Sequence, residues 1–230
     1  MFNEEDQPFI YGHIPIVVAR CCEFLKKEGT EAMGCLTTSG DEQRVEDLIT
    51  ILDTAPFTGK SLKWRYTVFD AATTLHRYLT SLPEPLIPNH IADRLITELV
   101  ARRFMPALPP PQDLNILIKL YKDAIYKLPP LNFQLLMYLL DMFWRFKINA
   151  AKNGAYGDVI LRYYHTVFFQ QVDGSPEVTM EQESAVLFLI DYQARFLYGI
   201  PGENGVMPRR TENAMSVQIS ARWGWGPQRL

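Results

Sequence analysis

The chain has 230 residues, a formal net charge of -3 at pH 7, 47% hydrophobic residues and 21% charged residues. A chain of this length can bury a full hydrophobic core without help from disulfides or metal ions. Because the charge balance is slightly acidic and no basic block occurs, nucleic acid and anionic membranes are disfavoured as main partners.

The cysteines and the absence of membrane signals bear on the compartment. The three cysteines are Cys21, Cys22 and Cys35, and none belongs to a CxxC pair. Such a set builds neither a disulfide framework nor a zinc site, which indicates a reducing compartment. No apolar run reaches the roughly 18–20 residues of a transmembrane helix, and the first residues are acidic, unlike a signal peptide. We therefore expect a cytoplasmic protein.

Helical periodicity dominates the first third of the chain. The apolar residues of 14–25 recur at the three- and four-residue spacing of one helix face. The same spacing recurs over 45–52, after Asp41, whose side chain suits the N-cap of that helix. A third face, over 68–79, stops at Pro83, because proline removes a backbone donor and biases the preceding residue away from helix.

Proline-rich connectors separate the remaining predicted helices. These helices run over 89–103, 114–125, 131–146, 155–169 and 180–198. The segment 131–146 is apolar nearly all round, which is typical of a central core helix. The segment 105–111 is expected to be a loop, and only a short stretch at Glu177 has strand character.

The sequence therefore predicts an all-α fold of about eight helices with proline-rich connecting loops. From Pro201 onward, the periodic pattern gives way to glycine, proline, arginine and asparagine. We expect one helical domain over 10–198 and a poorly ordered tail over 199–230.

No residue pattern points to chemistry performed by the chain itself. The four histidines, His13, His76, His90 and His165, lack the second ligand at i+4 spacing that a helical metal site would use. The sequence contains neither a GxxxxGK[ST] phosphate loop nor a G-x-S-x-G nucleophile elbow. We therefore expect no cofactor and no metal ion, and a helical interaction domain rather than a metabolic enzyme.

One segment is similar to a known family. Residues 75–88 read LHRYLTSLPEPLIP and resemble the helix and loop of a Rho GTPase-activating (RhoGAP) domain, where LKxYLRxLPEPLIP is typical. Other segments resemble elements of that family in the same order: IPIVV at 14–18, GCLTTSG at 34–40, LPPLN followed by LLMYL at 128–139, and the segment that begins at Asn153. The resemblance implies a helical signalling domain that docks on a Rho-family small GTPase. It implies no cofactor of its own, because GTP and magnesium belong to the partner.

The chain departs from this pattern at the residues that carry the family's activity. An active member inserts the arginine of a GIFRxSG loop, whose guanidinium neutralises charge on the transferring phosphoryl group and is worth about 10³–10⁵ in rate. Here Thr37 occupies that position, His76 that of a supporting lysine, and Thr80 that of the arginine that braces the loop. Asn153 matches the first asparagine of the NKMxxxNLA segment, whereas the second falls on Val159. The resemblance thus implies a pseudo-GAP with weak or no stimulation of hydrolysis.

Three functions remain open on the sequence. The first is a protein-binding domain that contacts a Rho-family GTPase, through Asn153 and Arg77 among others, without efficient stimulation. The second is an active GTPase activator in which a substitute arginine, Arg77 before Arg44 or Arg20, acts as the finger. The third is a structural scaffold with no GTPase partner. Under the first two functions, a partner GTPase would recruit this cytoplasmic protein to a membrane.

Overall fold

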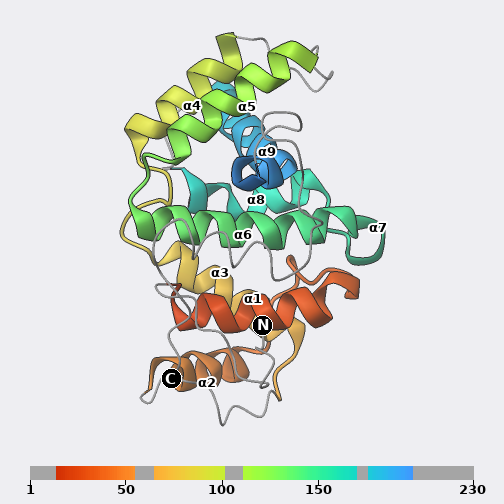
Figure 1. Cartoon of the computed structure of the whole chain (residues 1–230). Coiled ribbons are helices and arrows are strands. Elements are labelled where there is room, and N and C mark those ends of the chain that lie inside the picture. The colour runs from red at the N-terminus through yellow and green to blue at the C-terminus, as the bar shows by residue number, and fades with distance from the viewer. Residues whose placement is uncertain (1–13, 55–64, 102–110, 170–175, 199–230) are drawn as a thin grey trace. The chain divides into compact units, whose positions relative to one another are not determined.

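The computed structural model describes residues 14–54, 65–101, 111–169 and 176–198, and all regular structure in these residues is helical. The elements are α1 (Ile16–Glu28), the 3-10 helix η1 (Gly29–Glu31), α2 (Glu42–Asp53), α3 (Val68–Thr80), α4 (Asn89–Ala101), α5 (Pro111–Ile125), α6 (Pro130–Ile148), α7 (Ala150–Asn153), α8 (Gly157–Phe168) and α9 (Pro176–Tyr198) (Figure 1). The predicted all-α class is confirmed for this part of the chain. The tail predicted over 199–230 and the first residues of the predicted domain, 10–13, lie outside the described residues.

Three helices begin at a proline, and this explains most of the differences from the predicted boundaries. The first residue of α5 is Pro111, that of α6 is Pro130 and that of α9 is Pro176. The first helical position suits proline because its nitrogen would have no intrahelical partner there in any case. The prediction of a loop over 105–111 is therefore wrong at Pro111. The strand character expected at Glu177 is also wrong, because this residue lies in the first turn of α9.

One compact unit comprises the described residues of 14–83 and 141–167. Within it, α1, α2 and α3 pack against one another (Figure 1). The 3-10 helix η1 contacts both α1 and α7. The buried face of α1 consists of Val17, Val18, Cys21, Cys22 and Leu25. This face has the spacing that the sequence predicts, so burial of apolar side chains accounts for the position of α1.

Side-chain caps determine where α2 and α3 begin. The carboxylate of Asp41 accepts a hydrogen bond from the backbone amide of Arg44, which confirms Asp41 as the N-cap of α2. At the start of α3, the hydroxyl of Thr67 accepts a hydrogen bond from the Asp70 amide, and the Asp70 carboxylate accepts one from the Thr67 amide. This capping box satisfies two backbone donors of the first turn. The segment before α2 lies beside the first turns of α3, because the Asp41 amide also donates to the Asp70 carboxylate.

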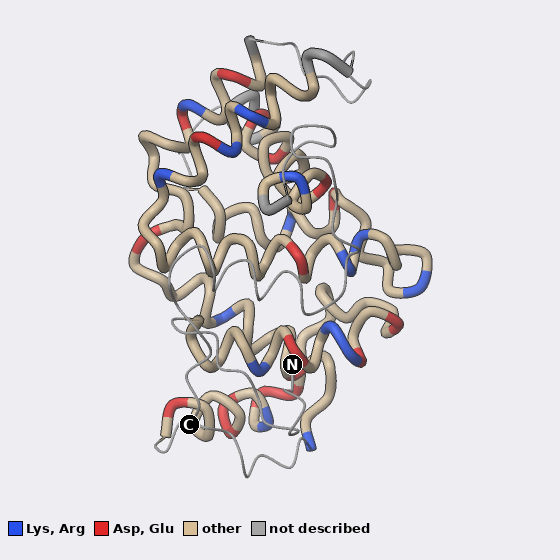
Figure 2. Tube along the Cα trace, in the orientation of Figure 1, with Lys and Arg blue, Asp and Glu red and all other residues tan. Residues whose placement is uncertain are grey.

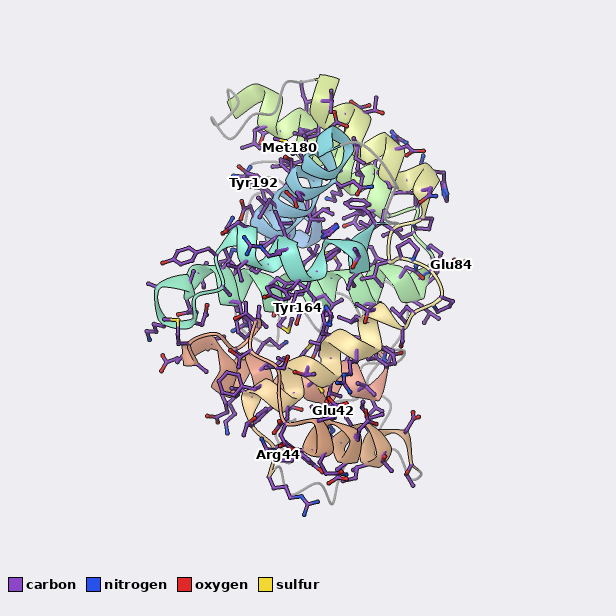
Figure 3. All side chains as sticks on the ribbon, turned by 180° about the vertical axis from the view of Figure 1, so that it is seen from behind. Glu42, Arg44, Glu84, Tyr164, Met180 and Tyr192 are labelled. Carbon is purple, nitrogen blue, oxygen red and sulfur yellow. The ribbon has the colours of Figure 1, made fainter. Side chains whose placement is uncertain are left out.

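A second compact unit comprises the described residues of 84–140 and 168–198. Its helices α4, α5 and α9 pack against one another. In the loop before α4, Leu86 is buried and its carbonyl accepts a hydrogen bond of 2.9 Å from Asn132 Nδ2, whereas Glu84 is exposed (Figure 3). The proline-rich loop is thus tied to its own unit by a buried leucine and a backbone hydrogen bond.

The helix α6 is buried around most of its circumference, as its apolar sequence predicts. The side chains that are 0% exposed in this helix are Leu136, Met137, Leu139, Leu140, Met142, Phe143 and Phe146. A helix of this kind contributes to the core on several faces. The prediction that the segment 131–146 is a core helix is confirmed.

Candidate functional site

The segment 34–41, called the finger loop below, connects the region of η1 to α2. Its beginning is held by Gly34, whose φ of 71° lies in the left-handed region that favours glycine. The Gly34 amide donates a 2.9 Å hydrogen bond to the carbonyl of Asn153. The next two side chains, Cys35 and Leu36, are 0% and 6% exposed. One end of the finger loop is therefore anchored by buried side chains and by a backbone hydrogen bond to α7.

The tip of the finger loop is a tight turn that carries Thr37. The amides of Thr37 and Thr38 both donate to the carbonyl of Gly34, at 3.0 and 2.9 Å. The hydroxyl of Thr37 donates to the same carbonyl at 3.2 Å. Thr37 is exposed, but its side chain is short and neutral, and its hydroxyl is turned back toward the backbone of its own loop.

The other end of the finger loop lies directly on α3. The Gly40 amide donates a 2.8 Å hydrogen bond to Thr73 Oγ1, and the Asp41 amide donates one of 2.9 Å to Asp70 Oδ1. A Cβ added to Gly40 would lie 2.6 Å from the Cα of Asp70. Only glycine permits so close an approach of the two backbones.

The carboxylate of Asp70 is the centre of this contact. It is 0% exposed and also accepts hydrogen bonds from Arg44, at 2.9 Å from Nε and 3.4 Å from Nη2. Burial alone would raise the pKa of Asp70, but the hydrogen bonds from Arg44, Thr67 and Asp41 outweigh it and hold this pKa below its ordinary value. Asp70 is therefore a buried carboxylate whose negative charge is stabilised by donors from three segments.

Arg77, the predicted substitute for the finger, points to α2. Its Nη2 lies 2.5 Å from Glu42 Oε2, and its Nη1 lies 2.9 Å from Glu46 Oε1. These hydrogen bonds and charges raise the pKa of Arg77. Acidic and basic residues share α2 in Figure 2, and Glu42 and Arg44 are labelled on it in Figure 3. Arg77 bridges α3 and α2 in this arrangement.

The two predicted supporting residues on α3 do not reach the finger loop. The Nε2 of His76 is hydrogen-bonded to the carbonyl of Tyr163 at 2.9 Å, and its ring lies edge-on to that of Tyr164 (labelled in Figure 3), with centroids 5.2 Å apart. The hydroxyl of Thr80 donates to carbonyls of its own helix, at 2.9 Å to His76 and 3.2 Å to Arg77. His76 therefore links α3 to α8, and Thr80 is hydrogen-bonded within α3.

Asn153 is buried beneath the finger loop, with 1% exposure. Its Nδ2 donates to the carbonyls of Thr30 at 2.8 Å and Phe146 at 3.1 Å, and its Oδ1 accepts from the Ala155 amide at 2.7 Å. Together with its carbonyl, which holds Gly34, this residue joins α6, η1 and the finger loop. The predicted contact of Asn153 with a GTPase stays a prediction, and the observed hydrogen bonds give the residue a role inside the fold.

The residues that hold the finger loop to α3 were not predicted from the sequence. Asp70 and Thr73 carry this contact, and the only sign of it in the sequence is the Thr67-x-x-Asp70 capping pattern. That pattern identifies the start of a helix. It does not reveal the donors on Gly40 and Arg44, which lie 33 and 26 positions from their acceptors on Thr73 and Asp70.

Neither a metal site nor a membrane-spanning helix is found in the described part of the chain. Among them, no group of three or more histidine, cysteine, aspartate or glutamate residues is placed to hold a metal ion. Within the same part of the chain, no helix is long and apolar enough to cross a membrane.

The chain is similar in sequence to proteins of one kind. Residues 15–155 match the family model described as the RhoGAP domain. The chain is 33% identical over 203 residues to Rho-GTPase-activating protein 5 of Schizosaccharomyces pombe, which covers 86% of this chain and 54% of that protein. It is 31% identical over 144 residues to Rho-GTPase-activating protein BAG7 of Saccharomyces cerevisiae, which covers 62% of this chain and 34% of that protein. The chain therefore spans about half of the first relative and a third of the second.

Solved structures share the fold. The chain is similar to the crystal structure of the BH domain from GRAF, the GTPase regulator associated with focal adhesion kinase, with a TM-score of 0.66 and 16% identity over 80% of this chain and 94% of that one. It is also similar to human Rho GTPase activating protein 15, with a TM-score of 0.61 and 18% identity over 78% of this chain and 82% of that one. At these identities the likeness establishes the helical architecture alone.

Proposed function

Because this chain belongs to the RhoGAP domain family, whose model matches residues 15–155, we propose that it binds a Rho-family small GTPase and stimulates GTP hydrolysis weakly or not at all. The partner class is supported by the names of the fungal relatives, which are called Rho-GTPase-activating proteins. The domain performs no chemistry of its own in this proposal. GTP and magnesium are bound by the partner.

The single observation that carries the weak activity is the neutral tip of the finger loop. A GTPase-activating arginine places a guanidinium against the phosphoryl oxygens as negative charge develops there, and this is worth about 10³–10⁵ in rate. At about 1.4 kcal/mol per tenfold change, the loss amounts to roughly 4–7 kcal/mol of barrier. Thr37 has no charge, and its hydroxyl is bonded to Gly34 O at 3.2 Å.

The arginines considered as substitutes all have acidic partners. Arg44 is bonded to the buried carboxylate of Asp70, and Arg77 to Glu42 and Glu46. Arg20 lies 3.5 Å from Glu23 on its own helix. A substitute finger would have to leave such a partner and extend into the GTPase. Because an exposed pair such as Arg77–Glu42 is worth only about 0–1 kcal/mol, these ion pairs weigh modestly against a rescued activity. They favour the pseudo-GAP over the active alternative.

Binding to a GTPase depends less on the missing arginine than stimulation of hydrolysis does. The backbone of the finger loop is held at both ends, at Gly34 and at Gly40–Asp41. Association energy comes from the whole contact surface, whereas a catalytic group acts on the transition state alone. A bound domain could still steady the water-positioning glutamine of the GTPase, which would leave a small residual stimulation.

The test is single-turnover GTP hydrolysis by a panel of Rho-family GTPases, with and without the domain, beside a pull-down on GTP-loaded and GDP-loaded forms. The proposal predicts binding to at least one GTPase with less than about tenfold acceleration, far below the arginine-finger range. Acceleration by about 10³ or more would refute it. In that case Arg77→Ala decides whether Arg77 is the finger. Binding to no GTPase in either nucleotide state would favour the scaffold function instead.

A further inference from the structure

The contact between the finger loop and α3 carries an inference about how the loop is positioned. We propose that Asp70 is the positioning residue of the finger loop, and that this loop is held ready to present residue 37 without help from residue 80. This inference rests on the proposed function for its hydrolysis readout. The holding contact itself can be tested without any partner.

The donors that meet at Asp70 come from the loop and from both helices beside it. Its Oδ1 accepts from the Asp41 amide at 2.9 Å, and its Oδ2 accepts from the Thr67 amide at 2.8 Å and from Arg44 Nε at 2.9 Å. Since the carboxylate is 0% exposed, water cannot replace these donors. Hydrogen bonds to an ionised group are the strong ones in proteins. One carboxylate therefore joins the end of the loop, the start of α2 and the start of α3.

A second contact limits the movement of the loop in the same place. The Gly40 amide is bonded to Thr73 Oγ1 at 2.8 Å, and a Cβ on Gly40 would lie 2.6 Å from Asp70 Oδ1 as well as from its Cα. The loop backbone thus lies against α3 with no space between them. With Leu36 buried on the other side, the turn of residues 37–39 lies between two anchored ends, and Thr37 is at its tip.

Thr80 takes no part in this contact. Both hydrogen bonds of its hydroxyl go to carbonyls of α3 itself. The loop is therefore held from the first half of α3, at Asp70 and Thr73, rather than from its last residue. On the proposed function, the weak activity would then come from the side chain at position 37 and not from the loop conformation.

The experiment restores the missing group and then removes the support. Thr37→Arg should accelerate single-turnover hydrolysis by about 10³ or more in a GTPase that the unaltered domain binds, the lower end of the arginine-finger range. Adding Asp70→Asn to Thr37→Arg should then lower that rate by about 10²-fold, because a misplacement near 1 Å costs about this much. Adding Asp70→Asn should change the dissociation constant of the domain for the GTPase by less than about threefold. A purely structural loss would instead weaken binding and lower the rate together.

Matched variants separate positioning from a general loss of folding. Asp47→Asn is the same substitution on α2, at a carboxylate that is bonded only to Gln43 in the described contacts, and should leave the Thr37→Arg rate unchanged. Thr73→Val removes the acceptor of the Gly40 amide and should lower the rate, whereas Thr73→Ser keeps the hydroxyl and should retain it. Circular dichroism and thermal unfolding identify any variant that does not fold, and the threonine pair still decides the question if Asp70→Asn is such a variant.

Amide hydrogen exchange gives a readout without a GTPase. Asp70→Asn should speed exchange at the amides of Gly40 and Asp41, and Asp47→Asn should not. The inference is overturned if those amides exchange as in the unaltered protein, if Asp70→Asn and Thr73→Val leave the Thr37→Arg rate unchanged, or if Thr37→Arg accelerates hydrolysis only together with Thr80→Arg. If no GTPase binds, the proposed function fails, and the exchange rates still decide the role of Asp70.

Discussion

Replacing Asn153 with alanine removes a side chain that is 1% exposed and whose polar atoms are all hydrogen-bonded. The hydrogen bonds of its side-chain amide to the Phe146 carbonyl and to the Ala155 backbone amide are buried. Truncation leaves the Ala155 amide without this acceptor, whereas the Phe146 carbonyl keeps the hydrogen bond from the Asn149 amide. The change also removes the link between the Thr30 carbonyl and the end of α6.

The size of the effect follows from the Ala155 amide and the Thr30 carbonyl, which both lose their hydrogen bond to Asn153. A buried donor or acceptor left unpaired costs about 1–3 kcal/mol. Water that enters the vacated space recovers part of this, so we expect Asn153→Ala to lower the free energy of unfolding by about 2–4 kcal/mol. Asn149→Ala is the control, because Asn149 makes a part-buried hydrogen bond to the Arg145 carbonyl and should cost less than about 1 kcal/mol.

Urea unfolding followed by circular dichroism measures both variants. A shifted midpoint at unchanged slope reports a change in stability alone. A loss within about 0.5 kcal/mol of the control would refute the reasoning from buried hydrogen bonds. A loss of GTPase binding larger than the loss of folded protein would instead support the direct partner contact that the resemblance implies for Asn153.

Three further predictions concern the core of the same unit. Gly40→Ala brings a Cβ to 2.6 Å from Asp70 Cα, so we expect a stability loss of about 1–3 kcal/mol, and an unchanged thermal midpoint would contradict the close approach. Because the pKa of Asp70 is lowered in the folded state, its contribution to stability is full above the unfolded pKa of about 3.9 and is lost as the pH falls through the folded pKa. The stability of Asp70→Asn should therefore fall less steeply with pH in this range. Identical pH profiles for the variant and the unaltered protein would contradict a stabilising role of the Asp70 charge. Burial raises the pKa of Cys22 and that of Cys35 to about 12, so both thiols should react slowly with a disulfide reagent at pH 7 until the protein unfolds; rapid labelling of the folded protein would show that they are accessible.

Periodicity predicted α1, α2 and α3 well because each of them buries one continuous apolar face, and α6 was predicted from its nearly uniform apolar sequence. The faces of α1 and α2, including the N-cap at Asp41, are those expected from residue spacing. The short helix α7 has only 4 residues, too few to show a period of 3.6. The starts of α5 and α9 were missed because proline breaks a helix in its interior but suits its first position.

The candidate site was predictable only where a residue acts within a local motif. The position of Thr37 follows from the GCLTTSG segment, and the structure places it at an exposed turn. Asp70 is the only acidic residue of α3, and the sequence shows it only as a first-turn residue in a capping pattern. Its role depends on the packing of α2 against α3, which joins atoms of residues 26 positions apart. Likewise, the bonds of Asn153 to Thr30 span 123 positions, so no local pattern reveals them.

The most direct test of the central claim is the single-turnover rate of GTP hydrolysis by a GTPase that the unaltered domain demonstrably binds. In the bound complex, the rate should stay within about tenfold of that of the free GTPase, since Thr37 supplies no charge to the transition state. A rate raised by about 10³ or more in that complex would contradict it, because only a group equivalent to an arginine finger produces such a change.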